Sequence, residues 1–418
     1  TLDHNGKEIV VACAVGHLYG LKEAKKNGWK YPTFSYEWRP LHEINKNAQH
    51  VKPFIELLQK LAKGADRFTI CTDYDDEGTV LGLNALRFAC GQKDASRMKF
   101  STLTKAELVD SYEKKLKHID WGNAKAGITR HALDWEWGIN TSRALTLAVK
   151  SAGRFKILST GRVQGPALKI IVDKEKEIKK FNPVPYWQLR LAGIIKDGEI
   201  TALHKEDKFW DEKKAKDVFK KTKGEKARIS DVKRKEIMQQ PPAPFDLTTL
   251  QTEAYRCFGI APKQTQAIAQ SLYVAGLISY PRTSSNKLPP SLNYKKIISD
   301  LAQQKAYTAL CNDLLQNKVL KPNEGKKSDA AHPACHPTGE KPGKLTERDA
   351  KVYDLIVKRT LATFGPDAKR QTMTVEIDVK KEPFVTKGTT TIEPGWHDYY
   401  KPYVAVKDEE LPNLEKGE

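Results

Sequence analysis

The sequence lacks any long run of apolar residues and any pair of closely spaced cysteines. Its longest uninterrupted apolar run covers residues 9–15, far short of the roughly 20 residues that a membrane-spanning helix needs. The six cysteines are scattered without a C-x-x-C pair, which argues against zinc ribbons and a disulfide framework and predicts mostly buried thiols. No basic and apolar leader precedes a cleavage site. We therefore expect a protein that works inside a cell and away from the membrane.

Positive charge, by contrast, is in excess. The chain carries 71 Lys and Arg against 52 Asp and Glu, a formal net charge of +19 over 418 residues. A field of that sign concentrates polyanions such as nucleic acid near the surface. Ribosomal contacts or an anionic membrane would explain the charge equally well, so composition leaves the partner open. The length exceeds what one hydrophobic core supports and predicts two to four domains.

The period of the apolar residues changes along the chain. The first part alternates strands and helices, which suggests a parallel α/β sheet. A helical region follows it, and then a β-rich region with a charged, helix-like insert. Further helices and a β-like tail end the chain. The expected strands are 9–15, 67–72, 98–100, 186–194, 227–233 and 277–280, and the expected helices are 77–90, 105–117, 123–180, 246–258, 262–276 and 346–363.

Residues 71–78, CTDYDDEG, place four carboxylates where a predicted strand passes into a predicted helix. In an extended backbone alternate side chains share one side, so Asp73, Asp75 and Glu77 would converge while Asp76 points away. Carboxylates this close repel one another unless a cation lies between them, and Mg²⁺ favours such oxygen ligands. The alternative interpretation is a solvated acidic loop that caps the helix.

Residues 277–283, LISYPRT, place a tyrosine after a short predicted strand. An ordinary phenol is protonated at neutral pH. Tyr280 could therefore act as a nucleophile only beside a cation that favours the phenolate, and Arg282 is suitably placed to do this and to neutralise a phosphate. The alternative is a tyrosine that packs at a strand end beside an exposed arginine.

Six motifs resemble, in order, those of the type IA DNA topoisomerases, and several are nearer in wording to archaeal members. The stretches LTTLQTEAYRCFG (247–259) and AQSLYVAGLISYPRTSS (269–285) are similar to the active-site region of that family, and TDYDDEG (72–78) resembles its Toprim metal motif. The others are AVGHLYGL (14–21), LDWEWGINTSRAL (133–145), GRVQGPALKIIVDKEKEI (161–178) and SDAAHPACHPTG (328–339).

The resemblance implies a role for individual residues. Tyr280 would be the nucleophile that becomes linked to the 5′ phosphate of a broken strand, and Arg282 would hold that phosphate. Mg²⁺ would be bound by Asp73, Asp75 and Glu77. Arginine grips phosphate through a two-pronged fork and histidine can donate to an oxyanion, which suits the implied DNA-binding residues His17, Arg143, Arg162, Gln164 and His332. The family's usual arginine and second acid are Asp76 and Thr79 here, so metal affinity is expected to differ.

The resemblance also implies a multidomain fold that combines α/β, α and β parts, in which a Toprim Rossmann-like domain joins helical and β-rich domains in a ring. The expected domains are a Toprim domain (1–122), a helical DNA-binding domain (123–181), a β-rich hinge or arch (182–241 and 366–410), a catalytic tyrosine domain (242–365) and the start of a return to the helical domain (411–418). Family members carry a Glu-Lys-Pro motif before the first residue of this chain and further helices after its last, so we expect a core cut short at both ends.

The implied activity is magnesium-dependent and ATP-independent: one DNA strand is cut, another passes and the cut is resealed, which relaxes negative supercoils or decatenates DNA. We expect single-stranded or underwound DNA as substrate, a monomer, a cytoplasmic, nucleoid-associated location, and a helicase or single-strand-binding protein as candidate partners. The alternatives are the topoisomerase module of a reverse gyrase and a non-catalytic single-stranded DNA-binding fragment. Zinc is not expected at His332, Cys335 and His336, because the neighbouring prolines would break a helix that aligned them. A phosphate loop is not expected at 339–346, because the spacing of its glycines does not match that motif.

Overall fold

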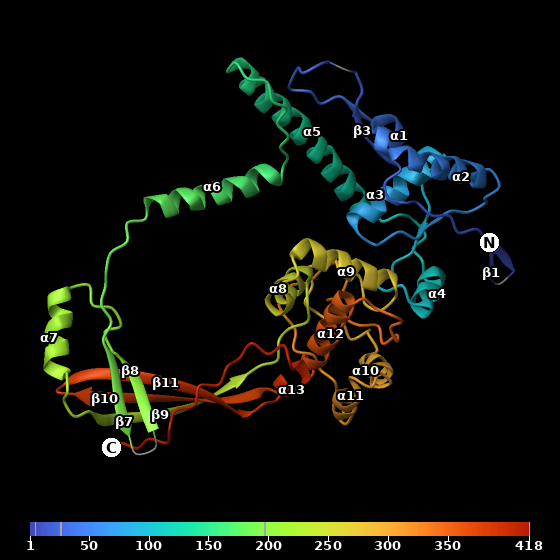
Figure 1. Cartoon of the computed structure of the whole chain (residues 1–418). Helices are drawn as coiled ribbons and strands as arrows, with labels where there is room; N and C mark the ends of the chain where they lie inside the picture. Colours follow the sequence, from blue (N-terminus) through green and yellow to red (C-terminus); the bar gives the residue numbers. More distant parts are fainter. Residues whose placement is uncertain (5, 26, 196–197, 418) are drawn as a thin grey trace. The chain divides into compact units, whose positions relative to one another are not determined.

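The structure is a computed structural model that describes residues 1–4, 6–25, 27–195 and 198–417 (Figure 1). The chain divides into two compact units, Thr1–Phe181 and Asn182–Glu418. Within the described residues, none of the helices has the length and apolar character needed to cross a membrane.

The first unit consists mainly of helices around short, paired strands. Its helices are α1 (Leu41–Ile44), the 3₁₀ helix η1 (Lys46–Val51), α2 (Lys52–Ala62), α3 (Asp76–Asn84), the π-helical turn η2 (Ala85–Ala89), α4 (Lys105–Glu113), α5 (Trp121–Ser151) and α6 (Gln164–Lys180). The strands pair as β1 (Leu2–His4) with β2 (Lys7–Ile9), β3 (Tyr19–Glu23) with β4 (Tyr36–Pro40), and β5 (Thr69–Ile70) with β6 (Ser96–Arg97). The β5–β6 pair is parallel and the other two are antiparallel.

Helices α3 and α5 pack closely beside the β5–β6 pair. Their shared core is made of buried apolar side chains, Ile70, Leu83, Leu86, Ala95, Ile119 and Ala124. Gly127 of α5 lies against α3, and a Cβ at this position would meet the Asp76 carbonyl oxygen at 2.7 Å and Val80 at 2.5 Å. Only glycine allows the two helix backbones to approach so closely, and this contact fixes α5 beside the acidic turn.

The second unit contains a five-stranded antiparallel sheet in the order β7-β8-β11-β10-β9. The strands are β7 (Arg190–Ile195), β8 (Gly198–His204), β9 (Arg228–Gln239), β10 (Ala368–Val379) and β11 (Glu382–Glu393). Helix α7 (Glu212–Thr222) lies near one end of the sheet (Figure 1). The sheet buries an apolar face formed by Ile200, Ala202, Ile229, Val375, Ile377, Val379, Phe384 and Leu414.

The chain between β9 and β10 folds into a helical group around α12, whose central side chains are fully buried. Its helices are α8 (Leu247–Phe258), α9 (Pro262–Val274), α10 (Tyr294–Ala302), α11 (Thr308–Leu315) and α12 (Glu347–Ala362), and α13 (His397–Tyr400) packs on α12 after the sheet. Asp246 and Thr249 form a capping box at the start of α8, and Gly259 ends it with φ +66°. The expected helices 246–258 and 262–276 are therefore confirmed, because their start and stop signals act locally.

Several expectations about local structure are wrong. Residues 98–100 form no strand, because β6 ends at Arg97. Residues 10–15 do not continue β2, and Val10, Val11 and Val15 are exposed, because no strand among the described residues lies alongside to pair with them. Residues 277–280 form no strand but a single bridge, Ile278 to Pro337. The cysteines are not mostly buried: Cys311 and Cys335 are, whereas Cys13 and Cys71 are exposed in irregular segments.

Candidate functional site

The acidic motif of the first unit forms a tight turn between β5 and α3. Asp75 is the N-cap of α3, and its Oδ1 accepts a hydrogen bond from the Gly78 backbone N–H at 2.7 Å. The Thr72 hydroxyl donates to the Gly78 carbonyl at 2.7 Å, and a Cβ on Gly78 would lie 2.2 Å from the Asp73 carbonyl oxygen. Glu77 lies in the first helical turn, so the expectation of an extended backbone up to Glu77 is wrong.

A fully buried arginine of β6 donates hydrogen bonds to the backbone of this turn. The Arg97 guanidinium donates to the Thr72 and Asp73 carbonyls at 2.6 Å each, and it is 0% exposed. It also lies 5.0 Å from the centre of the Tyr74 ring, and the Tyr74 hydroxyl donates to Asp120, the N-cap of α5, at 2.7 Å. Arg97 therefore fixes the backbone that carries Asp73 and compensates the negative charge of the turn.

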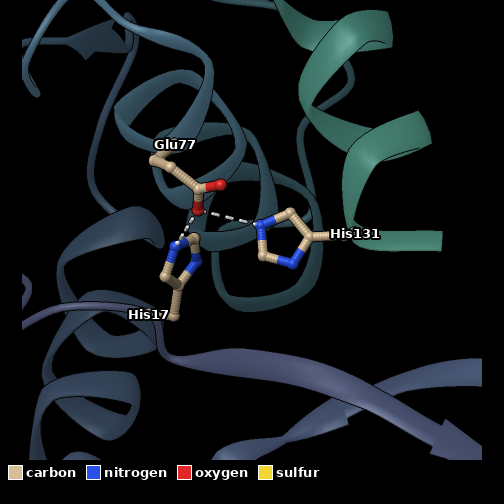
Figure 2. Close-up of side chains that lie close together, drawn as sticks. All are labelled: His17, Glu77 and His131. Carbon is tan, nitrogen blue, oxygen red and sulfur yellow. Dashed lines mark hydrogen bonds and ion pairs between the residues drawn. The ribbon is translucent and has the colours of Figure 1, made fainter. Parts of the chain in front are cut away.

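Glu77 accepts hydrogen bonds from two histidines on different elements (Figure 2). Its Oε2 lies 3.0 Å from His17 Nε2, in the loop before β3, and 3.1 Å from His131 Nε2 on α5. Burial lowers the pKa of His17 and the neighbouring His131 lowers it further, which outweighs the opposing effect of Glu77. The ring centres of the two histidines are 5.0 Å apart.

The residue types at the acidic turn fit a magnesium ion. Asp73, Asp75 and Glu77 offer hard carboxylate oxygens, and all three side chains lie on partly exposed residues of one turn. Glu77 has its Oε2 engaged by the two histidines and its Oε1 3.6 Å from Arg130 Nε. A role for Glu77 in magnesium binding would therefore require it to exchange these partners, and the three-carboxylate set stays a prediction.

Charged side chains connect Glu77 along α5 to the start of α6. Arg130 lies between Glu77 and Asp134, with its Nε 4.0 Å from Asp134 Oδ2. Asp134 in turn accepts a hydrogen bond from Arg162 at 2.7 Å, which lowers the pKa of the Asp134 carboxyl. Arg162 and Gln164, the first residue of α6, are exposed. The structure thus links two predicted DNA-binding residues to one predicted metal ligand, Glu77: Arg162 through this network and His17 directly.

Arg143, another predicted DNA-binding residue, forms a largely buried ion pair. Its guanidinium forms a two-pronged ion pair with Glu23 at 3.0 and 2.8 Å, and also donates to the Lys30 carbonyl at 2.8 Å. The two side chains are only 10% and 12% exposed. Arg143 therefore anchors the segment after β3 to α5, and its contact with DNA stays a prediction.

Replacing Arg143 with alanine is expected to lower the free energy of local unfolding of β3 and α5 by about 3 kcal/mol, because the Glu23 carboxylate would stay buried without its cation. Hydrogen exchange of peptides from β3 and α5 measures the effect locally, since a chain with two units need not unfold in one step. The Arg143 hydrogen bond lowers the pKa of Glu23, so the contribution is present at neutral pH and is lost as the pH falls through that lowered pKa.

The control for this prediction is Arg39→Ala. Arg39 also pairs with a glutamate, Glu37, at 2.9 Å, but the two side chains are 49% and 40% exposed. A pair this exposed to solvent contributes little to stability. Equal exchange rates in the two variants would show that the Arg143 pair does not stabilise the unit.

In the second unit Tyr280 is 2% exposed, and its ring lies between two aromatic neighbours. The ring centres of His332 and Tyr273 are 4.5 and 5.2 Å from that of Tyr280. Arg282, two residues further on, is exposed. The structure therefore brings together Tyr280 and His332, two predicted site residues that are 52 positions apart in the sequence.

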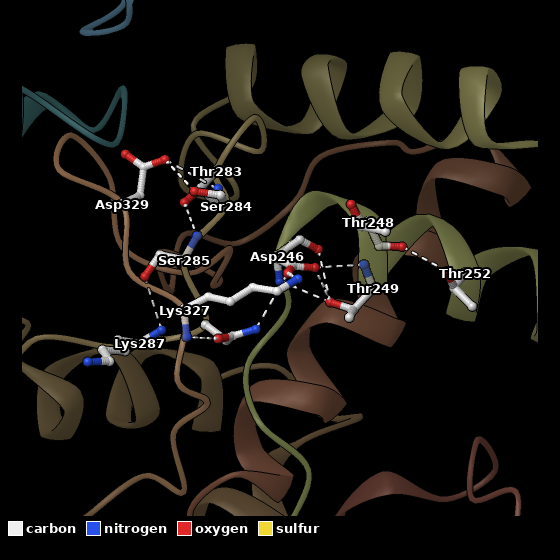
Figure 3. Close-up of polar contacts among 11 residues, drawn as sticks. Asp246, Thr248, Thr249, Thr252, Thr283, Ser284, Ser285, Lys287, Lys327 and Asp329 are labelled. Carbon is white, nitrogen blue, oxygen red and sulfur yellow. Dashed lines mark hydrogen bonds and ion pairs between the residues drawn. The ribbon is translucent and has the colours of Figure 1, made fainter. Parts of the chain in front are cut away.

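Backbone hydrogen bonds hold the tyrosine segment (277–287) beside the histidine segment (327–338). The Ser279 N–H donates to the His336 carbonyl at 2.8 Å, the Thr338 N–H to the Leu277 carbonyl at 3.0 Å, and the Ala334 N–H to the Lys287 carbonyl at 2.8 Å. The Asp329 carboxylate accepts from both the backbone and the hydroxyl of Ser284, at 3.3 and 3.0 Å (Figure 3). The pairing explains why the two motifs form one site.

A buried carboxylate at the start of α8 joins the same site (Figure 3). Asp246 is 2% exposed and accepts hydrogen bonds from Thr249 Oγ1 at 2.7 Å and Lys327 Nζ at 2.9 Å. Burial by itself would raise the pKa of Asp246, but the hydrogen bonds from Thr249 and Lys327 outweigh it and the pKa is lowered. Asp246 thus ties the start of α8 to the histidine segment as a charged group.

Sequence reasoning missed several residues at both sites. His131 and Arg130 lie just before the motif 133–145. For Arg130 the available signal was its helical spacing from Asp134, four positions further on. Arg97 gave no signal, because a single arginine beside apolar residues reads as an exposed position. Asp246 was recognisable only as a helix cap, and its pairing with Lys327 depends on the fold.

Two family models together match nearly the whole chain. A family model described as the Toprim domain matches residues 3–103, which include the turn with Asp73, Asp75 and Glu77. A second model, described as DNA topoisomerase, matches residues 99–418 and so covers more than half of the chain. The chain therefore belongs to the type IA DNA topoisomerases, as its motifs predict.

Curated relatives are similar over nearly the whole chain. DNA topoisomerase 1 of Pyrococcus horikoshii is 46% identical over 418 residues, which are 99% of this chain and 61% of that protein. DNA topoisomerase 1 of Methanocaldococcus jannaschii is 46% identical over 421 residues, which are 100% of this chain and 54% of that protein. The chain thus spans less than two thirds of the length of these relatives. Neither name favours the reverse gyrase alternative.

A solved structure supports the fold. Full-length topoisomerase I from Thermotoga maritima superposes with a TM-score of 0.70 over 97% of this chain and 65% of that one, at 23% sequence identity. The expected fold class, a multidomain combination of α/β, α and β parts, is confirmed by this likeness and by the Toprim match.

Proposed function

We propose that this chain is the part of a type IA DNA topoisomerase that cuts and reseals one DNA strand, with Tyr280 as the nucleophile. The observation that carries the proposal is the position of Tyr280 against His332 on two hydrogen-bonded segments. In this mechanism the tyrosine oxygen attacks a phosphorus atom of the DNA backbone. The bond between this phosphorus and the 3′ oxygen of the preceding nucleotide breaks, the tyrosine hydroxyl gives up its proton and the 3′ oxygen takes one up. Religation reverses these changes.

The roles of the surrounding residues follow from their chemistry. Arg282, exposed beside Tyr280, would neutralise the phosphate under attack, and His332 would orient the same group. Asp73, Asp75 and Glu77 would hold Mg²⁺, which would neutralise phosphate charge when bound. Because Tyr280 is 2% exposed, a conformational change must open a path to its hydroxyl before it can react.

Single-stranded or underwound DNA is the proposed substrate, and the net charge of +19 supports binding to its backbone. His17, Arg143, Arg162 and Gln164 are the proposed contacts of the first unit. Of these, Arg162 and Gln164 are exposed, and Arg162 donates a hydrogen bond from Nε to Asp134. The same proposal includes strand passage, which relaxes or decatenates DNA, a monomeric state, and a helicase or single-strand-binding partner. It also includes the domain boundaries 1–122, 123–181, 182–241 with 366–410, 242–365 and 411–418.

The polarity of a covalent adduct tests this function. The chain is incubated with Mg²⁺ and single-stranded DNA labelled at either end, and the reaction is stopped with detergent. We expect the 3′-labelled fragment to remain on the protein and the 5′-labelled fragment to be released with a free 3′ hydroxyl. Labelled protein of the opposite polarity would refute the proposed chemistry, and binding without any adduct would favour the non-catalytic DNA-binding alternative.

A further inference from the structure

The group formed by His17, Glu77 and His131 has the composition and geometry of a site for a transition-metal ion. One ligand atom from each residue lies within 4.8 Å of the other two. Figure 2 shows both imidazoles directed at the same carboxylate oxygen. One imidazole comes from the loop before β3 and the other from helix α5. The three side chains are between 25% and 34% exposed, so an ion could enter from solvent.

The distances suit an ion of the zinc class. Two ligand atoms that each lie 2.0–2.1 Å from a tetrahedral ion are about 3.3 Å apart. The two nitrogens lie 3.0 and 3.1 Å from Glu77 Oε2. Each of these two distances therefore needs to lengthen by only a few tenths of an ångström to accommodate an ion, and the two nitrogens lie within 4.8 Å of each other. Two imidazoles and a carboxylate prefer Zn²⁺, Co²⁺ or Ni²⁺, whereas Mg²⁺ prefers oxygen ligands alone.

The surrounding contacts hold the three ligands in place. Glu77 is in the first turn of α3, and the close approach of Gly127 to α3 fixes α5, which carries His131. The His131 ring also lies 5.6 Å from the ring of Trp38 on β4. Arg130 Nε, 3.6 Å from Glu77 Oε1, opposes a second positive charge. The expected affinity is therefore lower than that of a structural zinc site.

We propose that His17, Glu77 and His131 bind a divalent transition-metal ion at a site that shares Glu77 with the predicted magnesium cluster. The two ions then compete for one carboxylate, and an ion held by the histidines withdraws Glu77 from Asp73 and Asp75. The competition rests on the proposed function, because that function assigns Glu77 to magnesium. Binding of the transition metal itself does not depend on it.

Cobalt absorption tests the site directly, because Co²⁺ in a site with few ligands absorbs visible light more strongly than the hydrated ion. We expect the chain to develop a visible band that saturates with one equivalent of Co²⁺ and is abolished by Zn²⁺. His131→Ala and Glu77→Gln are each expected to weaken Co²⁺ binding at least about 10-fold. Comparable melting of the metal-free variants shows that they remain folded.

The matched control is His118→Ala. His118 also pairs with a carboxylate, Asp94, at 2.7 Å, but it is 73% exposed and has a single partner. This variant should bind Co²⁺ as the unaltered chain does. No saturable Co²⁺ or Zn²⁺ binding, or binding that His131→Ala and Glu77→Gln leave unchanged, overturns the proposed site.

Magnesium competition tests the sharing of Glu77 separately. Millimolar Mg²⁺ should raise the Co²⁺ concentration needed for half-saturation, and this shift should disappear in a double variant, Asp73→Asn with Asp75→Asn. A Co²⁺ affinity that Mg²⁺ leaves unchanged overturns the sharing of Glu77. The DNA adduct assay, which needs no transition metal, reports on the proposed function independently of both results.

Discussion

Replacing Tyr280 with phenylalanine is expected to lower covalent adduct formation on single-stranded DNA by at least about 10⁴-fold, because the attacking oxygen is lost. The substitution removes one atom from a ring that is 2% exposed. The packing against Tyr273 and His332 should therefore survive, and the loss of stability should stay near 1 kcal/mol. Adduct is measured by gel shift after the reaction is stopped with detergent, and stability by thermal unfolding.

Tyr273→Phe is the matched control for this experiment. Tyr273 is 1% exposed, belongs to α9, and packs edge-on against Tyr280 with the ring centres 5.2 Å apart. The Tyr273→Phe substitution therefore also removes one hydroxyl group from a buried ring of the same aromatic cluster. We expect adduct formation within a few-fold of the unaltered chain. Adduct that survives Tyr280→Phe would show that another residue is the nucleophile, and equal losses in both variants would indicate a packing effect.

Replacing Arg97 with leucine is expected to destabilise the acidic turn by about 5 kcal/mol, because two carbonyls and the carboxylates of Asp73 and Asp75 lose a fully buried cation. Arg97 donates to the carbonyls of Thr72 and Asp73 at 2.6 Å each. Without it the backbone that carries Asp73 is no longer fixed. A displacement of about 1 Å at a catalytic site can lower the rate by about 10²-fold, and we expect magnesium-dependent adduct formation to fall by that amount.

Hydrogen exchange of peptides that cover residues 70–80 measures the structural part of this effect. Arg97→Lys should be intermediate, because an ammonium keeps the charge but cannot reach both carbonyls with a rigid fork. The control is Arg87→Leu, an exposed arginine of the same unit that lies 5.5 Å from the Trp121 ring centre. Its loss should cost no more than about 1 kcal/mol. Unchanged exchange at the turn in Arg97→Leu would contradict the supporting role.

The elements that sequence reasoning predicted well carry their own signals. Helix α8 begins at a capping box of Asp246 and Thr249 and ends at Gly259 in the left-handed conformation, and these signals involve neighbours in the sequence. At 277–280 the pairing with the histidine segment is limited to a single bridge, Ile278 to Pro337. The expected strand at 9–15 ends at Ile9 because a strand needs a partner from elsewhere in the chain. Apolar composition by itself does not supply one.

The sequence by itself determined the family and the order of its motifs, and it predicted the residues that carry chemistry, since these are properties of residue type and spacing. Only the tertiary structure decided the partners of those residues. It set the ring of Tyr280 against that of His332, paired Glu77 with His17 and His131, and buried Arg143 against Glu23. Each of these contacts joins residues more than 50 positions apart, and their distances depend on helix packing and hydrogen bonding that no local pattern encodes.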